Sequence, residues 1–160
     1  MHRFVRLAVC ALLACFSFAP LALAHEYTVG TVTIYHPWAA ATPPGATTGA
    51  AYMKIVNKGK KALRLLKMST PVAEKVEIHS MTMDKGVMRM RPLTAPLKIA
   101  PNGTLALNHN GLHLMLIGLK KPLVEEEMVS LKLTFAGGKT VDVDLYVEAL
   151  GATAGSHDQH

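Results

Sequence analysis

The sequence predicts an all-β fold, a sandwich or a barrel, and three observations support this class. Short runs of alternating or β-branched residues recur between turn residues. No run carries an apolar stripe at helical spacing, and prolines stand in the gaps where a parallel α/β fold would place its helices. Half of the 160 residues are apolar, which is enough for one hydrophobic core, and the chain is too short for two full domains.

The first 24 residues are expected to form a secretory signal peptide. Two arginines precede an apolar run from Leu7 to Phe18, and Ala22-Leu23-Ala24 matches an A-x-A cleavage pattern. The run is too short to span a bilayer comfortably. Leu12-Leu13-Ala14-Cys15 loosely resembles a lipid-attachment box, but the apolar run continues past it. We therefore expect the mature chain to begin at His25.

Removal of the signal peptide changes the chemistry that the chain can carry. The segment holds two of the 17 basic residues and none of the 11 acidic ones, so the other 136 residues have a formal net charge of +4. These charges are scattered and aromatic residues are only 6% of the chain, which argues against nucleic-acid binding. Cys10 and Cys15 leave with the signal, so we expect no disulfide, thiolate ligand or thiol nucleophile in the exported protein.

Nine strands are expected in the domain that spans residues 25–150. In chain order they are Tyr27 to Ile34, Ala51 to Asn57, Ala62 to Met68, Lys75 to His79, Val87 to Arg91, Thr104 to Asn108, Leu112 to Gly118, Met128 to Phe135 and Thr140 to Val147. Asn110-Gly111 and Gly137-Gly138 are favoured tight-turn dipeptides, so each is expected to close a hairpin. Residues 151–160 are expected to form a flexible tail.

Soft metal ligands are concentrated between His79 and Met115. These 37 residues contain three histidines and five of the nine methionines, namely His79, His109, His113, Met81, Met83, Met88, Met90 and Met115. Thioether sulfur is a soft ligand and imidazole an intermediate one. A set of His and Met without Cys or carboxylate therefore favours Cu(I) over zinc, iron, magnesium or calcium.

Strand periodicity places several of these residues on common faces. His113 and Met115 lie opposite Leu112, Leu114 and Leu116, so the His-x-Met pair faces outward or toward a rim. The two Cα atoms are about 6.6 Å apart, and both side chains can reach one ion. By the same parity His79 leaves the apolar face of its strand.

Other methionines and histidines of the chain have an ordinary structural explanation. Met53, Met68 and Met128 are expected to fill gaps in the core. His109 lies in a turn, where a polar residue is expected in any case. Met88 and Met90 share one face of their strand, but the pattern does not decide which face is buried.

Six segments of the mature chain form a recognisable pattern: His36-Pro37-Trp38, Ala41-Thr42-Pro43-Pro44-Gly45-Ala46, Gly49-Ala50-Ala51-Tyr52-Met53, Val76-Glu77-Ile78-His79, Gly86-Val87-Met88-Arg89-Met90-Arg91-Pro92 and Gly111-Leu112-His113-Leu114-Met115. They resemble the periplasmic copper chaperone family called PCu(A)C. Its metal motif is a His, ten residues, a Met, twenty-one residues and His-x-Met. Here ten residues separate His79 from Met90, and twenty-two separate Met90 from His113. We expect the turn from Thr94 to Pro96 to hold the extra residue.

The resemblance implies a cupredoxin-like Greek-key β-barrel that binds one Cu(I) through His79, Met90, His113 and Met115. It also implies a periplasmic monomer that delivers copper for cytochrome c oxidase assembly, to the oxidase copper-site subunit or to a Sco-type thiol protein. Neutral ligands disfavour Cu(II), and an exposed site suits transfer of the ion better than catalysis.

The residues of the mature chain fit two other classes of protein less well and leave a third open. A blue-copper electron carrier needs a cysteine thiolate, which the mature chain lacks. Asp142 and Asp144 alternate with apolar residues as on any solvated strand face, so we expect no enzyme. A copper scavenging or storage protein without a delivery target stays open. His25, His157 and His160 could form a second site that prefers Cu(II).

Overall fold

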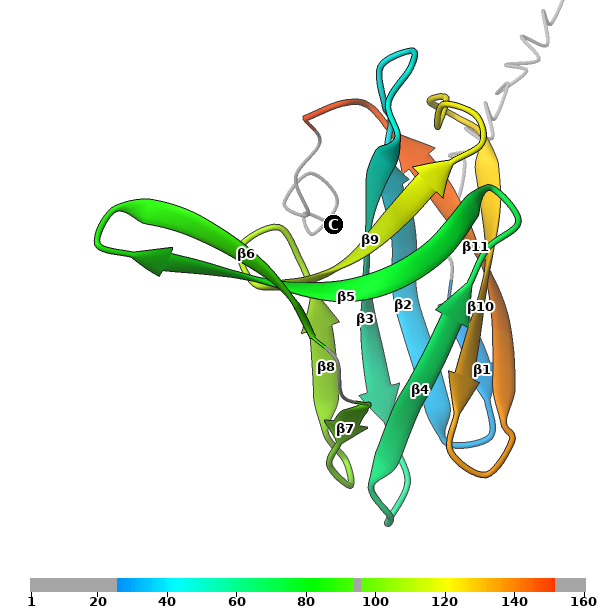
Figure 1. The fold of residues 1–160 in the computed structure, drawn as a ribbon. Helices are drawn as coiled ribbons and strands as arrows, with labels where there is room; N and C mark the ends of the chain where they lie inside the picture. Colours follow the sequence, from blue (N-terminus) through cyan, green and yellow to red (C-terminus); the bar gives the residue numbers. More distant parts are fainter. Residues whose placement is uncertain (1–25, 94–95, 152–160) are drawn as a thin grey trace, which may run out of the picture.

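The computed structural model describes residues 26–93 and 96–151, and it confirms the all-β class (Figure 1). Within these ranges the chain forms eleven strands: β1 (Glu26–Val29), β2 (Val32–Ala40), β3 (Thr48–Asn57), β4 (Leu63–Ser69), β5 (Ala73–Asp84), β6 (Val87–Leu93), β7 (Leu97–Ile99), β8 (Thr104–Leu107), β9 (Leu112–Leu119), β10 (Met128–Phe135) and β11 (Thr140–Glu148). None of the described residues belongs to a helix long and apolar enough to cross a membrane.

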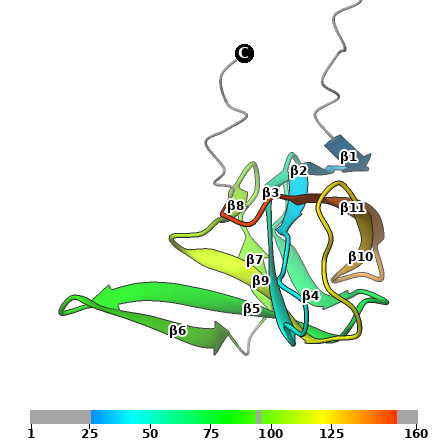
Figure 2. The ribbon, with the colours of Figure 1, turned by 90° about the horizontal axis from the view of Figure 1, so that it is seen from above.

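The strands join in one sheet with the order β6-β5-β9-β3-β2-β11-β10-β4-β7, while β1 pairs with β2 and β8 pairs with β3. The pairing of β11 with β2 is parallel, and the other described pairings are antiparallel. Seen from above, the sheet curls around its interior, and the β5–β6 hairpin extends away from the body (Figure 2). The two ends of this strand order, β6 and β7, do not pair with each other, so the sheet is open.

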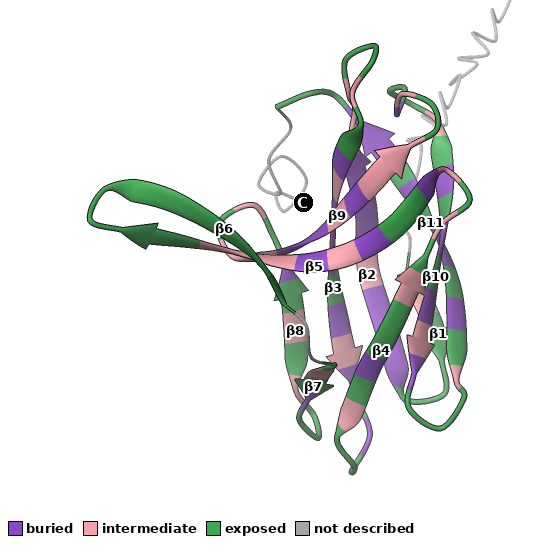
Figure 3. Ribbon diagram, viewed as in Figure 1, coloured by how far each residue is buried: buried purple, intermediate pink, exposed green. Residues whose placement is uncertain are grey.

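The core lies inside the curl and follows from strict alternation. In β10 and β11 every second residue is apolar and at most 2% exposed, and the residues between them are mostly polar and exposed. Figure 3 shows this alternation as bands along the strands. Each large side chain buried in this way contributes about 1.5–3 kcal/mol relative to an exposed position. Strand periodicity therefore determines which side chains of each strand point outward and are available for a functional site.

One expected hairpin is confirmed, and one expected strand is divided. Gly137 and Gly138 both have positive φ and connect β10 to β11, which pair along their length. The single strand expected from Tyr27 to Ile34 is wrong, because Gly30 has a φ of 62° and turns the chain between β1 and β2. The short strand β7 was not expected from the sequence.

The hairpin expected at Asn110-Gly111 is wrong, because β8 and β9 do not pair with each other. Both strands pair with β3 instead, end to end: Met53 lies opposite Leu107, and Ala51 lies opposite Leu114. Between the two strands the chain leaves the sheet in a loop of residues 108–111. Asn108 Oδ1 accepts a hydrogen bond from the backbone N–H of Asn110 in this loop, at 3.1 Å.

Candidate metal centre

His113 and Met115 lie on the outer face of β9. The neighbouring Leu114 and Leu116 are fully buried in the core, which confirms the alternation expected from the sequence. His113 is nevertheless only 3% exposed, and Met115 is partly buried. Side chains on the outer face must therefore cover this imidazole.

A cluster of three rings on that face reaches His113 through Tyr52. Trp38 and Tyr52 are directly opposite each other on β2 and β3, with ring centroids 4.5 Å apart. His109 stacks on Tyr52 with a centroid separation of 4.0 Å, and Tyr52 lies 6.4 Å from the ring of His113. Burial raises the pKa of the Tyr52 hydroxyl. Trp38, Tyr52 and His109 thus form a ring cluster next to His113.

Two irregularities of the backbone bring these rings to the outer face. The β2–β3 register shifts between Tyr35 and Trp38, where His36 has a φ of 46°. A bulge reverses side-chain parity, so Ile34 is in the core whereas Trp38 is outside it. His109 comes from the loop between β8 and β9. The sequence pattern indicates only a turn there, so it misses the contact of His109 with Tyr52.

His79 lies on β5 directly opposite His113 on β9. The two ring centroids are 6.1 Å apart, and the side chain of His79 is 13% exposed. Directly opposite residues share a face of the sheet. The structure therefore brings together the two histidines that are 34 positions apart in the sequence.

Glu77 holds the His79 ring in one orientation. Nε2 of His79 lies 3.0 Å from Oε2 of Glu77, whose other oxygen accepts a hydrogen bond from Lys75 Nζ at 2.7 Å. The Lys75 hydrogen bond, followed by that of His79, lowers the pKa of the Glu77 carboxyl, which is therefore charged and accepts the Nε2–H. In the tautomer that donates Nε2–H to Glu77, the lone pair lies on Nδ1, a buried atom with no hydrogen-bond partner. Such an atom is suited to bind a metal ion.

His113 is oriented by a backbone carbonyl. Its Nδ1 lies 3.4 Å from the oxygen of Gly111, which can only accept, so Nδ1 carries the proton in this contact. Burial is the main cause that lowers the pKa of His113, and the nearby His79 and His109 lower it further. The ring is therefore neutral at neutral pH, with Nε2 free to act as a ligand.

The two expected methionine ligands lie on the same face as the two histidines. Met115 is opposite Glu77 on β5, two register positions from the His79–His113 pair and therefore on the same face. Met90 lies on β6 opposite Met81 of β5, two register positions from the His79–Pro92 pair. Met90 is 45% exposed because it lies on the projecting hairpin. The four residues therefore come from three adjacent strands, β6, β5 and β9.

The spacing between Met90 and His113 is one residue longer than in the family motif, but this does not change how either residue is aligned with β5. Both β6 and β9 pair directly with β5, so their alignment with His79 is set by these two ladders and not by the length of chain between them. The turn from Thr94 to Pro96, where we expected the extra residue, lies partly outside the described residues.

The donor set of this face is two imidazoles and two thioethers. Within residues 26–93 and 96–151, no group of three or more His, Cys, Asp or Glu side chains could hold a metal ion. A site at this position would therefore depend on the sulfur atoms, which favours a soft ion such as Cu(I).

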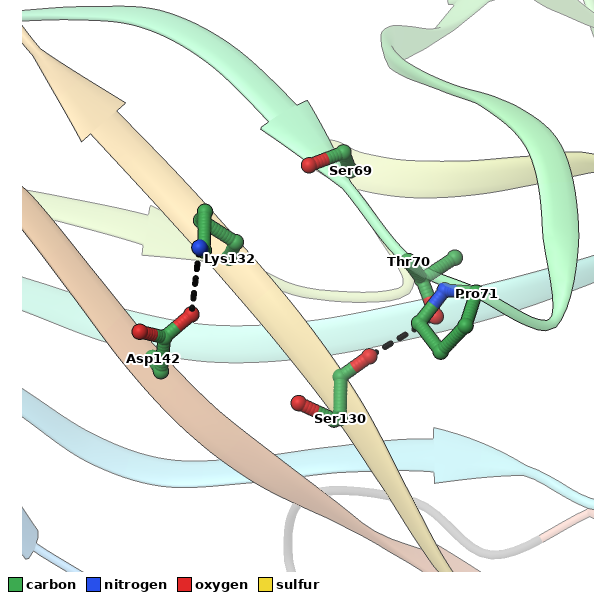
Figure 4. Close-up of a pocket in the computed structure, with 6 residues that line it drawn as sticks. All are labelled: Ser69, Thr70, Pro71, Ser130, Lys132 and Asp142. Atoms are coloured by element: carbon green, nitrogen blue, oxygen red, sulfur yellow. Dashed lines mark hydrogen bonds and ion pairs between the residues drawn. The ribbon is translucent and has the colours of Figure 1, made fainter.

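A hollow of about 420 Å³ lies elsewhere, between β4, β10 and β11 (Figure 4). In it Thr70 Oγ1 donates a hydrogen bond to the backbone oxygen of Ser130 at 2.7 Å. Lys132 Nζ forms an ion pair with Asp142 at 3.6 Å. Asp142 is therefore a charged residue on a solvated strand face, as expected from the sequence. The residues that line this hollow include three hydroxyl side chains but no histidine that could act as a base for them.

Several expectations concern residues outside the described ranges. These are the signal peptide of residues 1–24, the two cysteines within it, the flexible tail, and the second site suggested for His25, His157 and His160.

Comparison with known proteins gives matches at the levels of sequence and structure. The family model described as "Putative lipoprotein LpqE-like" matches residues 32–147. The "Putative lipoprotein Lxx21020" of Leifsonia xyli subsp. xyli (strain CTCB07) is 28% identical over 117 residues, which is 73% of this chain and 69% of that protein.

Solved structures with a similar fold include copper-bound proteins. The copper-bound PCuAC domain from PmoF2 has a TM-score of 0.67 and 26% identity, over 78% of this chain and 98% of that domain. The solution structure of apo-DR1885 from Deinococcus radiodurans has a TM-score of 0.59 and 31% identity, over 93% of this chain and 96% of that one. CuI-DR1885 from the same organism is 34% identical over 79% of this chain and 83% of that one, with a TM-score of 0.55.

Proposed function

The chain belongs to the LpqE-like family of PCuAC proteins, with a cupredoxin-like β fold, and from this premise we propose that it is an exported Cu(I) chaperone. The proposed ligands are His79, Met90, His113 and Met115. The observation that carries the proposal is the pairing of His79 with His113 on a face that also holds both methionines. The buried and unpartnered Nδ1 of His79 supports it.

The donor set favours Cu(I) as cargo over Cu(II). All four ligands are neutral, so they do not offset the higher charge of Cu(II), and thioethers prefer the softer ion. The copper-bound form of the DR1885 relative is described as CuI, which agrees with this choice. We expect His79 to bind through Nδ1 and His113 through Nε2, because the other nitrogen of each ring faces Glu77 or the carbonyl of Gly111.

The arrangement suits release as well as binding. His79 and His113 are largely buried, whereas Met90 is 45% exposed on β6, in the hairpin that projects from the body (Figure 2). A partner's thiolate or thioether can therefore replace Met90 first and reach the ion without unfolding the core. This sequence of steps is ligand exchange, and it needs no catalytic residue.

We further propose that the recipient is the copper-site subunit of cytochrome c oxidase or a Sco-type thiol protein, and that the protein acts as a monomer in the periplasm. The alternative is a copper scavenging or storage protein. Mixing the Cu(I)-loaded protein with a purified CuA domain, and separately with a reduced Sco-type protein, distinguishes them. Copper should move to one of the two recipients, and retention against both would favour storage.

Copper binding is tested by anaerobic Cu(I) titration of the chain from His25 onward against a chromophoric chelator. One tight equivalent is expected, and the double variant His113→Ala, Met115→Ala should lose it. Because His113 is buried, Met115→Leu serves as a second variant that keeps side-chain volume and removes only the sulfur. Met128→Leu is the control: the expectation that Met128 fills a gap in the core is wrong, because this residue is 49% exposed on the solvent face of β10. Tight binding by both site variants would refute the ligand set.

Export is tested at the N-terminus. The names of the family and of the Leifsonia protein include the word lipoprotein, which supports an exported location. We propose cleavage after Ala24, so mass spectrometry of the mature protein should find His25 as its first residue. A diacylglycerol-modified Cys15 would show lipid attachment instead.

A further inference from the structure

The β5–β6 hairpin carries four methionines on one face, and the proposed copper centre uses only one of them. We call this set the methionine ladder: Met81, Met83, Met88 and Met90. Met81 lies directly opposite Met90, and Met83 lies directly opposite Met88. The hairpin projects from the body of the protein, and the Met83–Met88 pair is next to its tip (Figures 1 and 2).

The turn fixes this pairing. Lys85 and Gly86 form a two-residue connection, and both have positive φ, 49° and 80°. Such turns match the twist of the flanking strands and set their register. Directly opposite residues in an antiparallel pair have Cβ atoms about 4.5–5.5 Å apart. The ladder therefore consists of two adjacent methionine pairs held in a defined register.

The two faces of the hairpin differ in chemistry. The face opposite the ladder carries Thr82, Asp84, Val87, Arg89 and Arg91, and Asp84 forms an ion pair with Arg89 at 3.4 Å. The ladder face holds only thioethers along the outer half of the hairpin. His79 lies on the same face, because the side chains of residues 79, 81 and 83 all point to one side of β5.

Packing does not explain these methionines. Met83 is 66% exposed and Met88 is 61% exposed, whereas a methionine that fills a gap in a core, such as Met53, is 3% exposed. A surface that only packs against apolar side chains of a partner could be built from leucine or isoleucine, so it would not require methionine at all four positions. What the four side chains share is a flexible chain that ends in a soft donor atom.

We propose that Met83, Met88 and Met81 form a second and weaker thioether site for Cu(I), which receives the ion and passes it inward to the centre. The proposal rests on the proposed function, since the centre is its destination. Met90 faces Met81 across the hairpin and is also a ligand of the centre, so it is the shared residue. The ion moves as Cu(I) throughout, and each sulfur that leaves is replaced by the next donor without a redox step.

The test uses the mature protein labelled with ¹³C at the methionine methyl groups, with Ag(I) as a redox-inert probe of Cu(I) sites. The first equivalent should shift the methyl signals of Met90 and Met115, and further equivalents should shift those of Met81, Met83 and Met88. The variant Met83→Leu, Met88→Leu should keep the first equivalent and lose the weaker one. Met128→Leu should keep both.

Loading kinetics give an independent readout. Transfer of Cu(I) from a chelator to the centre should be several-fold slower in Met83→Leu, Met88→Leu, with an unchanged affinity for the first equivalent. Signals of Met83 and Met88 that stay fixed under excess Ag(I), or a wild-type loading rate in the double variant, would overturn the proposal.

Failure of the two proposals can be told apart. If the first equivalent moves Met90 and Met115 but excess Ag(I) leaves the outer pair unaffected, the second site is refuted and the chaperone stands. If the outer pair responds to Ag(I) while the methyl signal of Met115 does not, the methionine ladder binds the ion and the proposed centre is refuted.

Discussion

Glu77 is predicted to strengthen metal binding through His79, although it does not contact the ion. Its Oε2 lies 3.0 Å from Nε2 of His79, and this contact keeps the proton on Nε2 and the lone pair on Nδ1. Loss of such a supporting partner commonly weakens metal binding by about 10–100-fold. Glu77 is 32% exposed and also binds Lys75, so we expect the lower end of that range, about tenfold, for Glu77→Ala.

The assay compares the Cu(I) affinities of three variants in competition with a chelator. Glu77→Gln should lose less than Glu77→Ala, because the amide oxygen still accepts the Nε2–H but has no charge. Glu125→Ala, which removes an exposed carboxylate in the loop between β9 and β10, should have no effect. Nitrogen NMR of the apo protein should show Nε2 protonated in His79, and a mixture of tautomers in Glu77→Ala. Wild-type affinity in Glu77→Ala, or copper bound to Nε2 of His79, would refute the reasoning.

The remaining predictions concern stability, pH and oxidation. Leu116 is fully buried, so Leu116→Ala should lower the free energy of unfolding by about 2–5 kcal/mol in urea denaturation, whereas Leu66→Ala at an exposed position should have little effect. Burial lowers the pKa of His113 below 6.5, so the unfolded chain takes up a proton before the folded one as the pH falls. Unfolding free energy of the apo protein should therefore be constant above this pH and decrease below it, and His113→Gln should flatten the decrease; an equal slope in the variant would contradict the assignment. Met90 is more exposed than Met115 but less exposed than Met83 and Met88, so the peroxide test uses the variant Met83→Leu, Met88→Leu, in which Met90 should be oxidised before Met115; titration of the product should show weaker Cu(I) binding because a sulfoxide is a harder donor. Oxidised protein with unchanged affinity would remove Met90 from the ligand set.

The sequence was sufficient where the position of a residue depends on strand parity. The outer face of His113 follows from the buried leucines beside it, and the strands β10 and β11 follow from alternation and from two glycines. Parity is a local property, because every second side chain points the same way whatever the partner strand is. The face shared by Met88 and Met90 could be recognised on the same ground.

The sequence was insufficient where position depends on which strands pair. Asn110-Gly111 is a favoured hairpin turn, yet β3 is ten residues long and offers ladder positions to both β8 and β9. Pairing along β3 therefore replaces the hairpin, and residues 108–111 become a loop that places His109 on Tyr52. The bulge at His36 that turns Trp38 outward is likewise decided by pairing between β2 and β3.

The rings and the hairpin make opposite contributions to the proposed site. On β5 and β9 the sheet fixes the backbone of both histidines, and Glu77 and the carbonyl of Gly111 select which nitrogen of each ring can bind. On β6 the side chain of Met90 is exposed and has three rotatable bonds, so it can leave the ion and return without disturbing the backbone hydrogen bonds of the sheet. Rigid imidazoles and a mobile thioether together give a site that holds its geometry while one ligand exchanges, and this is the property that transfer of an ion between proteins requires.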